Sequence, residues 1–379
     1  MPKINWQIFR GSDDLELTDY VQNIVVTWGR QTLVSPYQGR IATITIRNNN
    51  EQADYFQVNE AIYIYETFST PINAQYLFYG VVLNREFLDQ GGSGKGSTCV
   101  ITCVDGFYLA GTTITNKTLT DPVGTLEELA TTVTNPNAFP SGYWNFVGTT
   151  EASFEIGAFS GNIQSQMQQT ILADRGIVLF KAYDETEYVS PSIFQYIGLG
   201  YDFGRLADEF TIGYETLERS EAASEGTWFN NATITGALTT ATKSNGSSAE
   251  YGVKSFTTTS TQTNFVNSSA EWWANNYISP NRINVTLSFV DIAQDPDALE
   301  SFLSEQAFGG GFHNVIFTPP GGSSEQLTFW PEFYTVSASP EMTRVTLKMT
   351  NLNSYNNFIL NDSIFGVLDS SRLGVGEII

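Results

Sequence analysis

The chain has 379 residues, with 40 acidic and 18 basic side chains and a single histidine. Its net charge of −22 opposes tight binding to nucleic acid, because Lys and Arg contacts to phosphates supply most of that affinity. Charged residues make up only 15% of the chain, below the roughly 25% of ordinary soluble domains. The length exceeds one ordinary core, so we expect roughly two to four structural units.

The amino-terminal sequence gives no sign of export. Residues 1–10 lack the apolar run of about 7 to 15 residues that marks a secretory signal. No segment reaches the roughly 18 consecutive apolar residues of a membrane-spanning helix. We therefore expect a protein made and kept, or assembled, in a cytosol.

The first third of the chain has the pattern of β-strands. Apolar and polar residues alternate, or β-branched and aromatic residues gather, in residues 17–28, 39–47, 60–66, 75–87 and 98–104. Short polar turns between such strands predict a β-barrel or β-sandwich over residues 1–112. Residues 89–97 are Gly-rich and read as a hairpin loop. They do not form a phosphate-binding P-loop, because Lys95 is followed by Gly96 and a strand instead of Ser or Thr and a helix.

Cys99 and Cys103 lie in the last of these strands, on one face and about 13 Å apart at 3.3 Å per residue. This separation exceeds the roughly 7 Å Cα distance that a disulfide allows. Neither His nor another Cys stands near them in sequence. We predict two buried, apolar thiols and no metal pair.

The middle of the chain predicts a small α+β unit over residues 113–200. Residues 122–131 and 161–174 have helical apolar spacing, and the second helix is stopped by Arg175 and Gly176. Residues 177–183 and 184–189 then read as a strand, a turn and a second strand.

The remaining part returns to strands over residues 201–350, which we interpret as a second β-barrel with a helical insertion, although no clear internal repeat in the sequence supports a duplicated barrel. Strands are expected at residues 210–215, 228–235, 252–259, 283–290, 314–318 and 344–350, and helices at residues 268–276 and 296–308. Residues 351–379 are apolar without a core-forming period, so we expect an extended segment that a neighbouring protein covers.

Catalytic chemistry has few candidate residues in this sequence. His313 is the only histidine, and its Gly-rich neighbourhood favours a structural role over a Ser-His-Asp, Cys-His or metal site. Glu127 with Glu128, or the acidic residues of 184–187, could serve as paired carboxylates for glycoside hydrolysis. The first pair suits the amino-terminal end of a helix and the second group a turn. We expect no catalytic, metal-binding or cofactor-binding residues and no enzyme activity.

Eight short motifs stand out along the chain, at residues 18–21, 29–30, 39–48, 174–180, 229–234, 250–255, 358–362 and 371–374. They resemble, in the same order, motifs of the tail-tip or baseplate hub family of minor tail proteins from long-tailed bacteriophages. Each motif is weak alone, and their order along nearly the whole chain is what carries the resemblance. The segment at residues 268–279 departs from it, because Trp272 and Trp273 stand where the family helix is richer in Ala and Leu.

The resemblance implies a mainly β fold with two tail-tube-like β-barrel domains, a small α+β domain between them and an extended carboxy-terminal tail. It implies a homotrimeric ring that presents six barrels to a sixfold tail tube and carries a spike or fibre below. The expected partners are further copies of the chain, tail tube and distal tail proteins, and DNA only in passage through the lumen. The expected location is the virion tail tip, after assembly in the host bacterial cytoplasm.

Two alternatives remain open from the sequence. Aromatic side chains could stack on sugar rings in a receptor-binding or carbohydrate-binding tail module, although packing in the core explains most of the tryptophans better. A chain present in six copies would instead match the related distal tail protein. The aromatic candidates are Tyr143, Trp144, Trp272, Trp273 and Trp330.

Overall fold

The computed structural model describes part of the chain, and within some strands only the backbone. The described residues are 6–29, 38–48, 51–66, 76–88, 98–106, 108, 117–118, 144–147, 158–159, 177–180, 186–189, 208–212, 217–223, 230–236, 239–244, 252–259, 270, 283–290, 313–317 and 325–351.

Twenty-one strands and two short 3-10 turns are described. The amino-terminal part contains β1 (Trp6–Arg10), β2 (Leu15–Glu16), η1 (Thr18–Tyr20), β3 (Val21–Gly29), β4 (Gln38–Arg47), η2 (Gln52–Tyr55), β5 (Ala61–Glu66), β6 (Tyr76–Leu88) and β7 (Thr98–Val104). The middle contains β8 (Lys117–Thr118), β9 (Trp144–Val147), β10 (Ala158–Phe159), β11 (Ile177–Phe180) and β12 (Thr186–Val189). The rest contains β13 (Asp208–Ile212), β14 (Leu217–Ala223), β15 (Asn231–Thr235), β16 (Thr240–Ser244), β17 (Ser255–Thr259), β18 (Ile283–Val290), β19 (His313–Phe317), β20 (Glu325–Ala338) and β21 (Thr343–Asn351).

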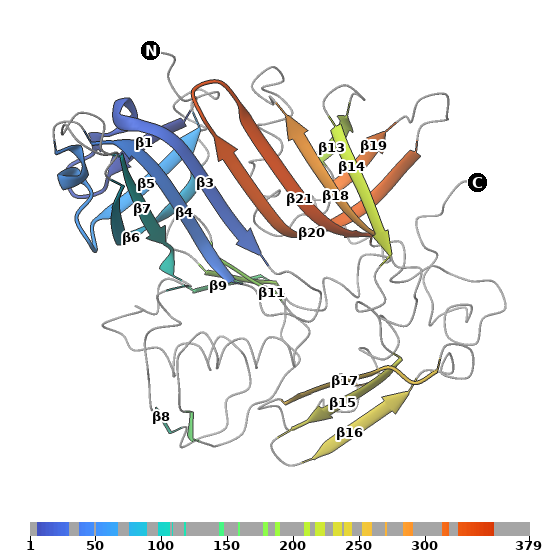
Figure 1. Cartoon of the computed structure of the whole chain (residues 1–379). Coiled ribbons are helices and arrows are strands. Elements are labelled where there is room, and N and C mark those ends of the chain that lie inside the picture. The colour runs from blue at the N-terminus through green and yellow to red at the C-terminus, as the bar shows by residue number, and fades with distance from the viewer. Residues whose placement is uncertain are drawn as a thin grey trace.

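One sheet of 13 strands combines strands from the amino-terminal and the carboxy-terminal parts of the described chain (Figure 1). Its order is β14-β18-β21-β20-β3-β4-β7-β6-β5-β1-β2, and β13 joins through β19, which pairs with β20. The join between the two halves is the antiparallel pairing of β20 with β3, from Phe333 opposite Gly29 to Ala338 opposite Ile24. Three smaller sheets, β10-β8, β11-β12-β9 and β16-β15-β17, are separate from it.

Alternating side chains along these strands place one face of the sheet against a core. In β4, Ala42, Ile44 and Ile46 are fully buried while the residues between them are partly exposed. Side chains two residues apart share a face, so the sheet buries one face and leaves the other to solvent. The buried face also includes residues of β20 and β21, and the sheet forms a curled half-barrel (Figure 1). Its buried apolar members include Trp6, Ile8, Ile24, Val26, Ile62, Ile64, Phe78, Val82, Ile101, Val336 and Val345.

Strand β20 is 14 residues long and changes neighbour halfway along. Residues 325–329 pair with β19 and residues 333–338 pair with β3, while β21 runs along the other side of the strand. Pro331 lies between the two paired stretches, and the register with β21 shifts between Pro331 and Phe333. Proline has no N–H to donate, so this position suits the gap between two partners.

The structure confirms the prediction of a mainly β protein. The predicted helices at 122–131, 161–174 and 296–308 lie outside the described residues, as does 268–276 apart from Ala270. The division into two tube-like barrels with an α+β domain between them, and the borders at residues 112, 200 and 350, stay predictions. The β3–β20 pairing does place strands from the first and the third predicted unit in one sheet.

Candidate functional site

One end of the half-barrel carries a buried polar group that we call the end cluster, formed by Trp28, Arg40, Asp105 and Tyr334. The residues come from β3, β4, the end of β7 and β20, and these strands are consecutive neighbours in the sheet. All four side chains are at most 4% exposed. The rings of Trp28 and Tyr334 lie 5.4 Å apart between centroids at an angle of 34°. The end cluster therefore joins the amino-terminal strands to the carboxy-terminal hairpin.

The carboxylate of Asp105 holds the backbone at this end of the half-barrel. The backbone N–H of Arg40 donates to Asp105 Oδ2 at 2.6 Å, and that of Tyr108 donates to Oδ1 at 2.9 Å. The backbone N–H of Asp105 in turn donates to the carbonyl of Arg40 at 3.1 Å. Gly39 allows this close approach, because a Cβ there would lie 2.6 Å from the nitrogen of Tyr108 and would collide with Asp105.

Arg40 brings a positive charge into the interior. It stands on the same face of β4 as Ala42 and Ile44, and it is only 4% exposed. Its Nε and Nη1 atoms make no hydrogen bond within the described part of the chain. Burial raises the pKa of the Tyr334 hydroxyl and the nearby charge of Asp105 raises it further, whereas Arg40 acts in the opposite direction. Arg40 and Tyr334 therefore lie close enough to interact across β3.

A second contact joins β1 and β21, two strands that are not neighbours in the sheet. The indole Nε1 of Trp6 in β1 donates to Thr343 Oγ1 in β21 at 3.4 Å, and both side chains are buried. The two residues are 337 positions apart in sequence. This contact and the β3–β20 pairing together hold the first and last strands of the described chain in one structure.

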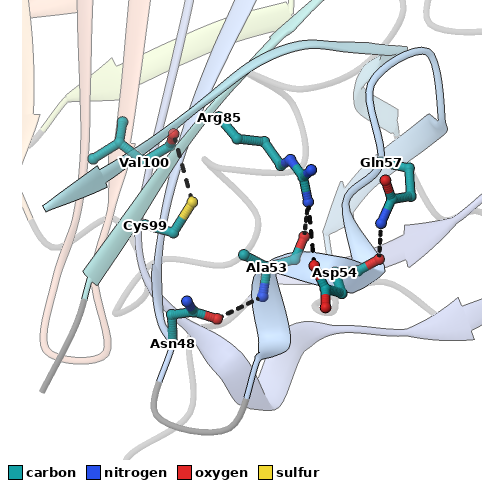
Figure 2. A network of polar contacts seen from close by, with 7 residues as sticks. All are labelled: Asn48, Ala53, Asp54, Gln57, Arg85, Cys99 and Val100. Carbon is teal, nitrogen blue, oxygen red and sulfur yellow. Dashed lines mark hydrogen bonds and ion pairs between the residues drawn. The ribbon is translucent and has the colours of Figure 1, made fainter. Parts of the chain in front are cut away.

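Beside the half-barrel, a polar network fixes the η2 turn against the outer half of β6 (Figure 2). The backbone N–H of Ala53 donates to Asn48 Oδ1 at 2.8 Å, and Arg85 Nη1 donates to the carbonyl of Ala53 at 2.9 Å. Arg85 also lies 3.6 Å from the carboxylate of Asp54. Three apolar side chains of β6 lie in solvent, namely Leu83, Phe87 and Leu88, which are 41%, 52% and 45% exposed. Phe87 and Leu88 are consecutive in the strand, so they project from opposite faces of β6. We call the three side chains the β6 apolar patch.

The two cysteines are placed as the sequence predicted. Cys99 and Cys103 are both buried and both are free thiols. Burial raises the pKa of each thiol, most strongly for Cys103. Burial therefore favours the protonated thiol over the nucleophilic thiolate at both positions.

The residues considered for catalysis are not brought together within the described part. The backbone of His313 lies in β19, opposite Phe329 of β20 and Asp208 of β13. Glu187 lies in β12, whereas Glu127, Glu128, Asp184 and Glu185 fall outside the described residues. The described residues contain no group of three or more His, Cys, Asp or Glu side chains that could hold a metal ion.

The described part of the chain also contains no helix with the length and apolar character needed to cross a membrane. Among the aromatic residues considered for sugar binding, the structure gives the backbone position of Trp144 in β9 and of Trp330 in β20. Tyr143, Trp272 and Trp273 lie outside the described residues, and so does the segment 352–379.

The end cluster was not singled out from the sequence as a site. Gly39 and Arg40 entered only as part of a family motif, and Asp105 and Tyr334 were not considered. A signal was present, because Arg40 occupies the apolar face of a strictly alternating strand, where a charged residue is costly without partners. No local pattern connects it with Tyr334, which lies far away in sequence.

No protein-family model matches the sequence, and no curated protein matches it. Solved structures of phage tail proteins do match the fold. A tail protein from Neisseria meningitidis MC58 superposes with a TM-score of 0.58 at 9% identity, covering 93% of this chain and 98% of that one. A 43 kDa tail protein of prophage MuSo2 from Shewanella oneidensis gives 0.56 at 10% identity, with coverage of 93% and 98%.

A third match extends the group. Prophage tail protein gp18 from Listeria monocytogenes EGD-e superposes with a TM-score of 0.50 at 11% identity, covering 91% of this chain and 94% of that one. At such low identity these matches concern the fold alone. The resemblance to phage tail proteins that the sequence motifs indicated is confirmed at that level: the chain has the fold of phage tail proteins over nearly its whole length.

Proposed function

We propose that this chain is a structural protein of a phage-type tail, the hub at the distal end of the tail tube. The observation that supports this most directly is the fold shared with tail proteins over 93% of this chain and 98% of theirs. Similarity along both whole chains favours a shared architecture over the sharing of one common module. A positional role also fits a sequence in which we expect no catalytic residues.

In this proposal three copies form a closed ring and each copy supplies two tube-like barrels. Head-to-tail contacts between copies generate a closed ring when the rotations from each copy to the next add up to a full turn. Because each chain supplies two barrels, a ring of three chains presents six barrels to the sixfold tube. The ring joins the tube to a spike or fibre and leaves a channel for DNA. The net charge of −22 suits such a channel, because DNA passing through it meets repulsion and not adhesion.

The proposed partners are further copies of the chain, the tail tube and distal tail proteins, and the spike or fibre. The proposed location is the virion tail tip, after assembly in the host cytoplasm. The apolar segment 352–379 is the part that neighbouring tail proteins cover in this arrangement. Removing residues 352–379 leaves β21 complete at Asn351, and we expect the shortened protein to fold but to stay out of assembled tails.

The copy number in the particle tests the proposal most directly. We expect images of purified tails to show three copies at the tail tip, and native mass spectrometry of the concentrated protein to show a trimer. Six copies would favour the distal tail protein instead. A monomer that is absent from tails contradicts a hub, and normal tails with lost host attachment after removal of 352–379 would favour a receptor-binding module.

The β6 apolar patch is a candidate contact between neighbouring copies. Phe87 and Leu88 expose 52% and 45% of their surface on opposite faces of β6, and a neighbour that packs around this end of the strand would remove apolar area from water. We expect the double substitution Phe87→Ser with Leu88→Ser to weaken trimer formation by at least about tenfold. Val253→Ser is the matched control, because Val253 is 68% exposed and lies beside the separate β15–β17 sheet. Equal loss in both variants would exclude a specific role for the patch.

A further inference from the structure

The small sheet β16-β15-β17 carries a regular array of short polar side chains on one face. β15 pairs antiparallel with β16 and parallel with β17, and the pairing sets residues of the three strands side by side in rows. Alternate residues of a strand share a face, so three rows across three strands give nine positions. All nine are Ser, Thr or Asn, and we call them the hydroxyl face. The rows are Ser244, Asn231 and Ser255; Thr242, Thr233 and Thr257; and Thr240, Thr235 and Thr259.

The hydroxyl face points into solvent. Its residues in β16 and β17 are all exposed, and in the central strand Thr235 is exposed while Asn231 and Thr233 are partly so. The opposite face of the sheet buries Ala232 and Ile234 completely. The sheet thus has an apolar side that is covered and a polar side that is open.

Hydrogen bonds between its own side chains order the hydroxyl face. The amide of Asn231 spans its row, because Nδ2 donates to Ser255 Oγ at 3.1 Å and Oδ1 accepts from Ser244 Oγ at 2.9 Å. In the next row the hydroxyls of Thr233 and Thr242 are 3.0 Å apart. A hydroxyl has one donor and two acceptor positions, so each keeps hydrogen-bonding capacity directed outward.

Asn230, the fully buried residue just before β15, holds β15 and β17 together where these two strands begin. Its Nδ2 donates to the carbonyl of Gly252 at 2.7 Å, and its Oδ1 accepts from the backbone N–H of Lys254 at 3.0 Å. Gly252 has a φ of +74°, a conformation that glycine adopts without strain. These contacts set β17 against β15 and so keep the rows in register. The array is ordered before any ligand arrives, which lowers the entropy cost of binding.

The chemistry of the face selects its ligand. None of the nine side chains is charged, although the chain has 40 acidic and 18 basic residues. A phosphate-rich ligand needs Lys or Arg, and an apolar ligand would bury hydroxyls without partners. Groups that both donate and accept match the hydroxyls of a sugar. The array measures about 10 Å by 13 Å, from strand spacing and residue rise, which suits a short stretch of polysaccharide.

We propose that the hydroxyl face binds an uncharged polysaccharide. Binding would take place through rows of Thr, Ser and Asn side chains on a flat sheet. It uses none of the aromatic residues that the sequence suggested for sugar stacking. This activity goes beyond a structural role in the tail and rests on a different part of the chain, so either proposal can fail while the other holds.

The test uses the full-length protein on an array of immobilised uncharged polysaccharides, including dextran, mannan and galactan, with heparin as the anionic comparison. We expect retention on at least one uncharged polysaccharide and none on heparin. The triple substitution Thr240→Val, Thr242→Val and Thr257→Val removes three hydroxyls and keeps the shape and the β-branched character of the side chains. It should weaken binding by about tenfold or more.

Two variants control for folding. Thr258→Val changes the same strand on the opposite face and should bind like the unchanged protein. Replacing Thr240, Thr242 and Thr257 by Ser keeps the hydroxyls and should keep binding within about threefold. The proposal is overturned if no uncharged polysaccharide is retained, if heparin binds equally well, or if the Val variant binds as before. A further outcome would also overturn the proposal: the unchanged protein binds no polysaccharide, and the Val variant is missing from assembled tails. The hydroxyl face would then be a contact with another protein.

Discussion

At the scale of single residues, the end cluster shows how a buried carboxylate is used inside an apolar half-barrel. Asp105 accepts hydrogen bonds from two backbone N–H groups, those of Arg40 and Tyr108. Removing a buried acceptor leaves its donors without partners, and each unpaired donor costs more than its hydrogen bond contributes in the intact protein.

The substitution Asp105→Ala should therefore be strongly destabilising. It leaves the backbone N–H groups of Arg40 and Tyr108 without their acceptor, so we expect a loss of about 2 to 5 kcal/mol in the free energy of unfolding. Urea denaturation followed by tryptophan fluorescence measures it. The matched control is Asp54→Ala, because the Asp54 side chain is 67% exposed and its ion pair with Arg85 contributes under about 1 kcal/mol. Similar losses for both variants would contradict the assigned role of Asp105.

Cys103 predicts how stability depends on alkaline pH. Burial raises its pKa above the ordinary value of 9.0, so the folded protein keeps the thiol protonated where the unfolded chain loses the proton. This contribution to stability is complete below pH 9.0 and is lost as the pH rises above it, by about 1.4 kcal/mol per pH unit. The variant Cys103→Val should show a flatter decline in urea denaturation above that pH. An unchanged decline would mean that the thiol is accessible in the folded state.

At the scale of elements, the sequence predicted strands that have a clear local pattern, but it did not predict which strands far apart in the chain pair with one another. Strands β4, β5 and β7 were predicted within one residue at each end, because strict alternation is a local signal. The longest strand, β20, was missed, and so were β1, β14 and β16. Pro331 interrupts the β20 pattern, and the sequence does not show that the proline falls between two pairing partners. The pairing of β20 with β3 has no local signature at all.

That pairing predicts how the chain divides into folding units. Residues 1–112 alone lack β20 and β21, which cover one end of the half-barrel and contribute Tyr334 and Thr343. We expect the isolated fragment 1–112 to give no cooperative unfolding transition. The same fragment joined through a Gly/Ser linker to residues 325–351 should give one, as measured by circular dichroism and thermal unfolding. Cooperative unfolding of the isolated fragment would show that the first barrel is complete without the hairpin.

At the scale of the whole molecule, charge dominates. Each copy carries a net charge of −22, so the copies of the proposed ring would repel one another. We therefore propose that largely apolar contacts hold them, because the chain has only 18 basic side chains against 40 acidic ones.

Self-association should therefore strengthen with added salt. Raising the NaCl concentration from about 50 mM to 500 mM shortens the range of repulsion and favours apolar contacts, so we expect tighter trimer formation. Analytical ultracentrifugation at both concentrations gives the association constants. Weaker association at high salt would point to ion pairs as the main contacts between copies.

The contact between Trp6 and Thr343 has a consequence for synthesis on the ribosome. The chain elongates at about 5 to 20 residues per second, so the 337 positions between these residues take roughly 20 to 70 s to make. During that time β3 has been made, but its partner β20 does not yet exist. An apolar strand edge without its neighbour is a site for unwanted pairing between nascent chains. We therefore expect the yield of correctly folded protein in the cell to depend on chaperones.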